Sequence, residues 1–279
     1  MHIFAPAKVN LALHVTGQRA DGYHELDSAV VLLNCGDDIH ISAHDGFKLT
    51  ADGPFGSMVP LDRSNLIAKA VDLMAQYHSK SPDVHIHLTK KLPPSSGIGG
   101  GSSDAAATLV GLAEFWGCDL PPVDHMTRLG ADVPVCLQRG TVRMRGIGQQ
   151  IDPLDWAWAG WYLLVNPGVG VSTPDVFRRL PNKSNPPLSV NKQITTDPIG
   201  WLRDQRNDLQ PPAVDIAPVI QDVLDTLSRQ DGVELVRMSG SGATCFALFD
   251  DYDACQHAAR NIVSDQPKWW VAMAQTCCE

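Results

Sequence analysis

A run of glycine and serine that leads straight into an apolar helical pattern constrains this sequence more than any other feature. The run extends from Pro93 to Asp104, and from Ala105 to Trp116 apolar residues recur at helical intervals, which predicts a helix with one apolar face. Glycine lets a backbone turn tightly and approach a ligand, and the free N–H groups at a helix start attract anions. The segment therefore predicts an anion-binding loop, with a serine-capped flexible loop as the alternative.

The spacing of this segment excludes two common phosphate-binding motifs. The lysine of a Walker A loop is missing, and Ser102 stands in place of the last glycine of G-x-G-x-x-G. Ser102 and Ser103 are residue types that cap helix N-termini, so we expect the helix to begin behind them. Each interaction with a helix dipole is worth only about 0.3–1 kcal/mol, so a triphosphate would also need several N–H hydrogen bonds and a cation.

Two other segments place charged residues where they could act in catalysis. Asp132 lies in Gly130-Ala-Asp-Val-Pro134, where a rigidly held carboxylate can serve as a general base. A capping or Asx-turn aspartate is the commoner explanation of such a position. Lys8 and Asn10 share the polar side of an alternating pattern over residues 9–15, which predicts a strand with one buried face. Lys8 could neutralise a phosphate there, and a solvated strand face is the plain alternative.

Three further motifs are less specific. In Asp21-Gly-Tyr-His24, Tyr23 could stack on a base and His24 could hydrogen-bond to it, although an exposed hairpin turn explains the same residues. Residues 239–243 form a second loop of small side chains. His85 and His87 share one strand face and could hold a metal, but ordinary strand histidines are the favoured interpretation because no further ligand follows at metal spacing.

The order of these patterns predicts an α+β fold in two domains. Strand and helix patterns interleave without a regular βαβ repeat, and a length of 279 residues suits two domains. The Pro-, Asp- and Trp-rich stretch at 152–158 indicates the boundary, so we expect domains at 1–153 and 154–279. Besides the elements above, the patterns predict helices at 65–77, 214–227 and 254–263, and strands at 29–33, 39–41, 84–88, 141–145, 161–165 and 244–249.

Composition excludes several classes of protein. The formal net charge is −9, whereas a general nucleic-acid binder needs a basic surface. The longest nearly apolar stretch, residues 156–165, is too short to span a membrane, and no export signal is recognisable. Seven cysteines without a C-x-x-C pair, of which Cys277 and Cys278 are adjacent, are typical of a reduced cytosolic protein. We expect a cytoplasmic protein that binds small molecules, and neither nucleic acid nor membrane.

Taken together, these segments resemble the GHMP kinases, a family of small-molecule kinases. Three blocks carry the resemblance in the family's order, at residues 5–10, 93–107 and 239–243. The blocks at 19–26 and 129–134 are similar to members that phosphorylate a cytidine-diphosphate-linked alcohol in non-mevalonate isoprenoid synthesis. The resemblance spans nearly the whole chain. It implies an N-terminal domain like domain 2 of ribosomal protein S5, a ferredoxin-like C-terminal domain and an active site in the cleft between them.

The resemblance also implies phosphoryl transfer from ATP with Mg²⁺. Asp132 matches the catalytic aspartate and would accept the hydroxyl proton, while Lys8 would keep Asp132 ionised and offset charge on the attacking oxygen. Ser102 or Ser103 could contribute to the Mg²⁺ site, whose ligands stay open. The residues that would enclose the ATP phosphates are Pro93, Pro94, Ser95, Ser96, Gly97, Ile98, Gly99, Gly100, Gly101, Ser102 and Ser103. In a chain that is negative overall, the positive groups expected to attract phosphate are Lys8, Lys90, Lys91 and the helix start.

On the side of the alcohol substrate, Tyr23 and His24 match positions that recognise cytosine, Phe177 would complete the stack, and Asn10 would bind hydroxyls. Asp104 departs from the family's pattern, because some relatives carry Asn there, and so does the Ser95-Ser96 pair, where many carry Gly or Ala. Two alternatives remain: a homoserine or mevalonate-type kinase of the same family, and a non-catalytic nucleotide-binding protein. The protein is expected to be a monomer or a homodimer.

Overall fold

The computed structural model describes residues 1–156 and 158–277, so Cys278 of the predicted thiols lies outside the described residues. The chain forms two compact units, each assembled from several segments. The first unit contains residues 1–8, 36–94 and 99–138, and the second contains residues 9–35, 95–98 and the described residues from 139 onward. Because both units are discontinuous in sequence, the predicted domain boundary after residue 153 stays a prediction.

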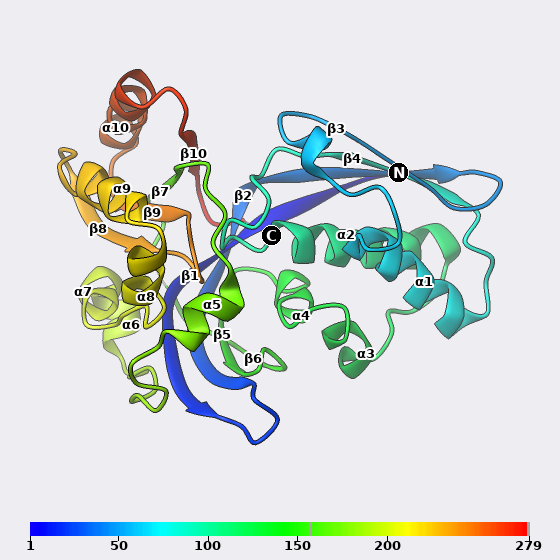
Figure 1. Cartoon of the computed structure of the whole chain (residues 1–279), viewed down its shortest axis with the longest axis horizontal. Coiled ribbons are helices and arrows are strands. Elements are labelled where there is room, and N and C mark those ends of the chain that lie inside the picture. The colour runs from blue at the N-terminus through cyan, green and yellow to red at the C-terminus, as the bar shows by residue number, and fades with distance from the viewer. Residues whose placement is uncertain (157, 278–279) are drawn as a thin grey trace. The chain divides into compact units, whose positions relative to one another are not determined.

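Ten strands and ten α-helices make up the described part of the chain (Figure 1). The strands are β1 (His2–Gln18), β2 (His24–Ala43), β3 (Lys48–Asp52), β4 (Val84–Thr89), β5 (Thr141–Gly146), β6 (Gln150–Pro153), β7 (Trp161–Asn166), β8 (Val233–Met238), β9 (Cys245–Phe249) and β10 (Trp270–Ala274). The helices are α1 (Leu66–His78), α2 (Gly100–Trp116), α3 (Val123–Thr127), α4 (Val133–Cys136), α5 (Thr173–Arg178), α6 (Gln193–Thr196), α7 (Pro198–Arg203), α8 (Gln210–Ile216), α9 (Val219–Ser228) and α10 (Tyr252–Asp265), with a 3₁₀ turn at Gly56–Met58. None of the described helices is long and apolar enough to cross a membrane.

The first unit packs α1 and α2 against a sheet that contains β3, β4 and the second part of β2 (Figure 1). Strand β4 pairs parallel to β3 and antiparallel to β2, and Val84, Ile86 and Leu88 are buried along one of its faces. Gly111 lets α2 approach closely, because a Cβ atom there would lie 2.6 Å from the side chains of Ile3 and Ile41. These contacts fix the axis of α2, and with it the position of the helix start.

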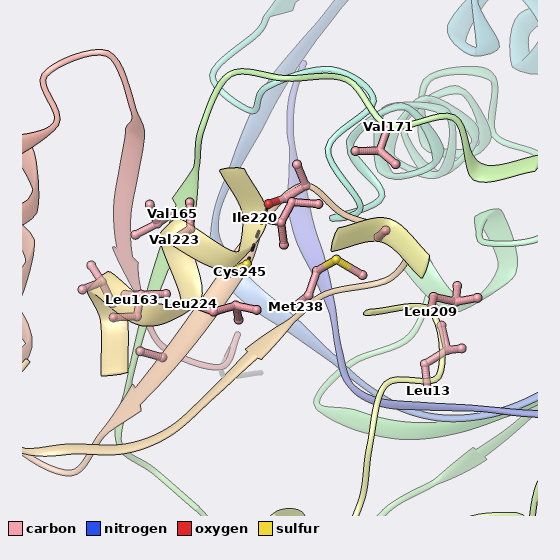
Figure 2. Close-up of a cluster of buried hydrophobic side chains, with 14 of the residues drawn as sticks. Leu13, Leu163, Val165, Val171, Leu209, Ile220, Val223, Leu224, Met238 and Cys245 are labelled. Carbon is pink, nitrogen blue, oxygen red and sulfur yellow. Dashed lines mark hydrogen bonds between the residues drawn. The ribbon is translucent and has the colours of Figure 1, made fainter. Parts of the chain in front are cut away.

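The second unit contains an antiparallel sheet in the order β10-β7-β9-β8, with α9 and α10 packed against it. Counting its strands along the chain, this order is 4-1-3-2 in a βαββαβ arrangement, which is the ferredoxin-like topology. Leu163, Val223, Leu224 and Met238 belong to its core, shown in Figure 2. The expected ferredoxin-like fold of the C-terminal half is confirmed.

Two expectations about local structure were wrong. Strand β1 is buried on both faces rather than one, because its polar residues find partners: His14 Nδ1 lies 3.0 Å from the Pro186 carbonyl, and its Nε2 accepts the Arg206 N–H. The single helix predicted over 214–227 is divided into α8 and α9. Pro218 explains the break, because the residue before a proline is disfavoured in helical conformation.

Candidate active site

Lys8 and Asp132 form an ion pair within the first unit. Lys8 comes from β1 and is only 4% exposed, and its Nζ lies 2.7 Å from Asp132 Oδ2. Asp132 precedes α4, yet its side chain makes no capping hydrogen bond to that helix. About a third of the Asp132 side chain is exposed, with a relative area of 32%. The Asp132 carboxylate is therefore held by a buried ammonium, does not cap the helix, and is still accessible to a substrate.

Gly99 brings the glycine-rich segment directly over the Lys8 side chain. Its φ is 67°, in the left-handed region that favours glycine, and a Cβ atom at this position would lie 2.9 Å from Lys8 Cε. No side chain other than hydrogen fits between the loop backbone and the lysine. The glycine thus fixes how closely the loop and the Lys8–Asp132 pair approach.

Replacing Gly99 by alanine should cost both stability and turnover. We expect the free energy of unfolding to fall by at least about 1 kcal/mol, because left-handed backbone is unfavourable for a residue with a Cβ atom. Displacement of Lys8 should lower kcat/KM by about tenfold or more. Chemical denaturation and steady-state kinetics measure the two effects. Gly117→Ala is the matched control, because Gly117 has a left-handed φ of 61° and, its chain neighbours aside, no atom of the described residues within 4 Å of its Cβ position. It should lose stability and keep its kcat/KM, and an equal loss of kcat/KM in both variants would contradict the assignment.

Helix α2 begins earlier than the serines suggested. Its N-cap is Gly99, which has no side chain to cap the helix, and Ser102 and Ser103 lie inside the first turns. The prediction that the serines are N-caps was therefore wrong, because the left-handed Gly99 starts the helix before them. Ser103 N donates to the Gly99 carbonyl, whereas the N–H groups of the first turn have no partner one turn back in the helix. N–H groups in this position can bind an anion, and that role of α2 stays a prediction.

The middle of the glycine-rich segment belongs to the second unit, where it is bound to the loop at 239–243. Ser239 Oγ donates to the Gly97 carbonyl at 3.0 Å, and Thr244 N donates to the Ser96 carbonyl at 3.0 Å. A Cβ atom on Gly97 would lie 2.5 Å from the Ser239 carbonyl oxygen. The small residues of the second loop therefore have a structural purpose, which is to seat residues 95–98.

The two lysines expected to attract phosphate are already paired with carboxylates in the first unit. Lys90 is 3% exposed, and its Nζ donates to Asp37 and Asp104, each at 2.6 Å. Burial alone would lower the pKa of Lys90, but the two carboxylates outweigh it and raise the pKa above its ordinary value. Lys91 pairs with Asp38. The structure therefore does not support Lys90 and Lys91 as unpaired phosphate-attracting charges, and the same role for Lys8 and the helix start stays a prediction.

On the side of the second unit, His24 and Phe177 are brought together by stacking. Their ring centroids lie 4.6 Å apart with 22° between the planes. Burial and the charge of Lys183 lower the pKa of His24, so its imidazole is neutral near pH 7, and its buried Nε2 has no hydrogen-bond partner among the described residues. Tyr23 is 61% exposed. Two of the three predicted base-recognition residues thus meet, and their role in recognising a base stays a prediction.

Asn10 lies near the second small-residue loop, in the same unit. It is 1% exposed, its Nδ2 donates to Ser28 Oγ at 2.8 Å, and its backbone N–H donates to Ser239 Oγ at 3.0 Å. A Cβ atom on Gly240 would lie 3.3 Å from Asn10 Oδ1. These contacts hold the side chain in one orientation, and its predicted role in binding substrate hydroxyls stays a prediction.

The histidine motif of β4 has an ordinary explanation. His85 Nε2 and His87 Nδ1 both lie within 2.9 Å of Thr50 Oγ1, so the threonine hydroxyl holds the two rings. Across residues 1–156 and 158–277, no group of three or more His, Cys, Asp or Glu side chains is placed to hold a metal ion. The two hydrogen bonds to Thr50 support the favoured interpretation as strand histidines.

Comparison with known proteins places this geometry in a family. Two family models match the chain, described as the GHMP kinases N-terminal domain at residues 65–141 and the GHMP kinases C-terminal domain at residues 198–266. The chain belongs to the GHMP kinase family, as the resemblance predicted. Its α+β fold with two domains is that of the family.

Relatives of high identity narrow the comparison within the family. The chain is 45% identical over 278 residues to a 4-diphosphocytidyl-2-C-methyl-D-erythritol kinase of Rhizobium etli, with 98% of this chain and 93% of that protein covered. It is 48% identical over 274 residues to the enzyme of the same name from Ruegeria pomeroyi, with 96% of each covered. A crystal structure of 4-(cytidine 5'-diphospho)-2C-methyl-D-erythritol kinase superposes with a TM-score of 0.81 at 31% identity, covering 99% of this chain and 100% of that one.

Sequence reasoning did not find the buried group that Lys90 forms with Asp37 and Asp104. Burial raises the pKa of Asp104 to about 7 despite the neighbouring lysine, and its Oδ1 has no hydrogen-bond partner among the described residues. One signal was available: Asp104 is an aspartate that follows two serines inside an otherwise small and apolar helix. Nothing in the sequence, however, links it to Asp37.

Proposed function

We propose that this protein transfers the γ-phosphoryl group of ATP to the 2-hydroxyl of 4-diphosphocytidyl-2-C-methyl-D-erythritol, a step of the non-mevalonate route to isoprenoid precursors. The observation that carries the proposal is the Lys8–Asp132 pair, with its Nζ–Oδ2 distance of 2.7 Å, directly beneath Gly99 of the glycine-rich segment. The names of the relatives supply the substrate. The predicted placement of the active site in a cleft between two domains stays part of this proposal.

In the transfer, Asp132 acts as the general base and Lys8 stabilises negative charge. Asp132 accepts the proton of the substrate hydroxyl as the oxygen attacks the γ-phosphorus, and general-base catalysis of this kind is typically worth about 10²–10⁴-fold. The Lys8 ammonium stabilises the negative charge that grows on the attacking oxygen. Because Lys8 is buried, its charge is poorly screened by water and acts strongly on that oxygen.

The start of α2 is the part that binds the phosphates of ATP. Phosphoryl transfer relies mainly on positioning and charge neutralisation, which suits the uncapped N–H groups of Gly100, Gly101 and Ser102. The hydroxyl of Ser103 is buried and has no hydrogen-bond partner among the described residues, and a hard oxygen donor of this kind fits Mg²⁺. Bound there, Mg²⁺ would neutralise charge on the phosphate oxygens.

The cytidine of the substrate is recognised by Tyr23, His24 and Phe177, and Asn10 binds hydroxyls of the methylerythritol. The unpartnered Nε2 of His24 suits an edge of cytosine, and the Phe177 ring suits its face. The protein acts in the cytoplasm on small molecules, without nucleic acid or membrane, as a monomer or a homodimer.

Phe177→Ala should weaken binding of the alcohol substrate selectively. Stacking of a base on an aromatic ring is worth about 1–3 kcal/mol, so we expect KM for the cytidylyl alcohol to rise by roughly tenfold or more while KM for ATP stays within about twofold. Steady-state kinetics with each substrate varied in turn provides the measurement. Phe115→Ala, which removes an exposed ring of α2, should change neither value. A selective rise in KM for ATP in the Phe177 variant would contradict the role.

A panel of alcohols tests the proposed reaction. ADP release should depend on 4-diphosphocytidyl-2-C-methyl-D-erythritol and should be absent with homoserine or mevalonate. Turnover of homoserine or mevalonate with an inert cytidylyl alcohol would replace the substrate by that of another family member. ATP binding without turnover of any alcohol would favour the non-catalytic alternative.

A further inference from the structure

Three separate segments of the first unit meet at the ammonium group of Lys90. Lys90 follows β4, Asp37 comes from β2, and Asp104 comes from the second turn of α2. Both carboxylates accept from Lys90 Nζ at 2.6 Å, and the three residues are 3%, 0% and 4% exposed, respectively. A buried ammonium must be paired, because breaking such a pair leaves an uncompensated charge in the protein interior. The three segments are therefore held together strongly at this point.

This buried group joins the two ends of the glycine-rich segment. Before the segment, the second oxygen of Asp37 accepts the backbone N–H groups of Lys91 and Leu92 at 2.6 and 2.8 Å. After it, Asp104 directly follows Ser103. A Cβ atom on Gly100 would lie 3.1 Å from Lys90 Nζ, so the absence of a side chain at Gly100 gives the ammonium its place. Entry and exit of the segment are thus fixed by one hydrogen-bonded group.

We propose that Asp37, Lys90 and Asp104 form a clamp that holds both ends of residues 93–103 together and so presents the first N–H groups of α2 to the ATP phosphates in a fixed arrangement. In this proposal Lys90 is a positioning residue, not a phosphate ligand. The clamp rests on one part of the proposed function, which is that residues 93–103 bind ATP.

Physical reasons support a clamp over a direct ligand. Backbone N–H groups bind a triphosphate well only if they already converge on it, because ordering a loop during binding consumes affinity. Bringing the ends of a flexible segment together carries an entropic cost. The ion pairs of Lys90 offset this cost when the protein folds, so that it does not reduce the affinity for ATP. One ammonium between two carboxylates also leaves no positive charge for a phosphate, and Lys90 is too buried to reach one.

The test compares ATP with adenosine, which lacks the phosphates, in calorimetric titrations without the alcohol substrate. Asp104→Ala removes the helix end of the clamp, whereas Asp104→Asn keeps an oxygen that accepts from Lys90. Thr108→Val is the matched control, because it removes a buried hydrogen bond to the Asp104 carbonyl inside the same helix and leaves the clamp intact. If the alanine variant does not fold, Asp104→Ser takes its place. Melting temperatures record the loss of stability in each variant.

We expect Asp104→Ala to lower the affinity for ATP at least about tenfold, while the affinity for adenosine stays within about twofold of wild type. In Asp104→Asn, the affinity for ATP should stay within about threefold of wild type. Thr108→Val should lower the melting temperature without changing the ratio of the two affinities. Equal losses for ATP and adenosine, or no loss in a folded alanine variant, would overturn the clamp. A wild-type protein that binds ATP but phosphorylates no alcohol would refute the proposed function and leave the clamp in place, whereas failure to bind ATP would refute both.

Discussion

Asp132→Asn should lower kcat by about 10²–10⁴-fold while the protein still folds and binds ATP. The amide has nearly the shape of the carboxylate and can still accept from Lys8 Nζ, which lies 2.7 Å from Asp132 Oδ2. It cannot take a proton from the substrate hydroxyl, so the chemical step loses its base while the phosphate-binding groups stay in place. Single-turnover kinetics measures the chemical step, and calorimetric titration measures ATP affinity.

An exposed aspartate of the same unit provides the control for this variant. Asp124 lies in α3, is exposed, and has no ion-pair partner among the described residues. Asp124→Asn changes the net charge by the same amount and should leave kcat unchanged. If Asp132→Asn turned over at the wild-type rate, Asp132 would not be the base, and a structural role through its contact with Lys8 would be the remaining explanation of its position.

Lys8→Met should lower kcat by about 10²–10³-fold, the loss typical of removing one group that stabilises an oxyanion. Methionine fills similar space under Gly99, and the carboxylate left behind is one-third exposed and can be hydrated. The variant should therefore fold, and it should lose less stability than a variant that leaves a fully buried charge without its partner. Rapid-quench measurement of the phosphoryl-transfer step separates this effect from product release.

Two comparisons sharpen the test of Lys8. Lys8→Arg should not restore activity, because the space beneath the loop is too small for the larger guanidinium. Even a Cβ atom on Gly99 would lie only 2.9 Å from Lys8 Cε. Combining Lys8→Met with Asp132→Asn should cost little more than Asp132→Asn alone, since residues that act as a unit are strongly non-additive. A kcat for Lys8→Met within threefold of wild type would contradict a role in transition-state stabilisation.

Local patterns predicted many elements of this fold because their causes are local. Helix α1 begins where Asn65 caps it by accepting from Ile67 N, and α2 ends at the left-handed Gly117. Strand β4 alternates buried and half-buried residues as its sequence does. In each case, the cause is a cap, a left-handed residue or a side-chain period that lies within a few adjacent residues, so the sequence alone is enough to predict the element.

Features that depend on tertiary contacts could not be predicted in this way. Lys8, Asn10 and His14 read as one polar strand face, yet they are buried, because residues distant in the sequence supply their partners. The start of α2 was misplaced because a left-handed Gly99 replaces a serine cap. The clamp joins Asp37, Lys90 and Asp104, which no spacing rule connects. For the candidate site, motif and resemblance therefore identified the residues, while the structure identified what each one contacts.

Phosphorus NMR of the reaction products tests the central claim most directly. Wild-type protein incubated with ATP, Mg²⁺ and 4-diphosphocytidyl-2-C-methyl-D-erythritol should form one new phosphomonoester, on the 2-hydroxyl, in an amount equal to the ADP released, and Asp132→Asn should form almost none in the same time. A phosphate on another hydroxyl, inorganic phosphate in place of the ester, or equal product from the Asp132 variant would contradict the account.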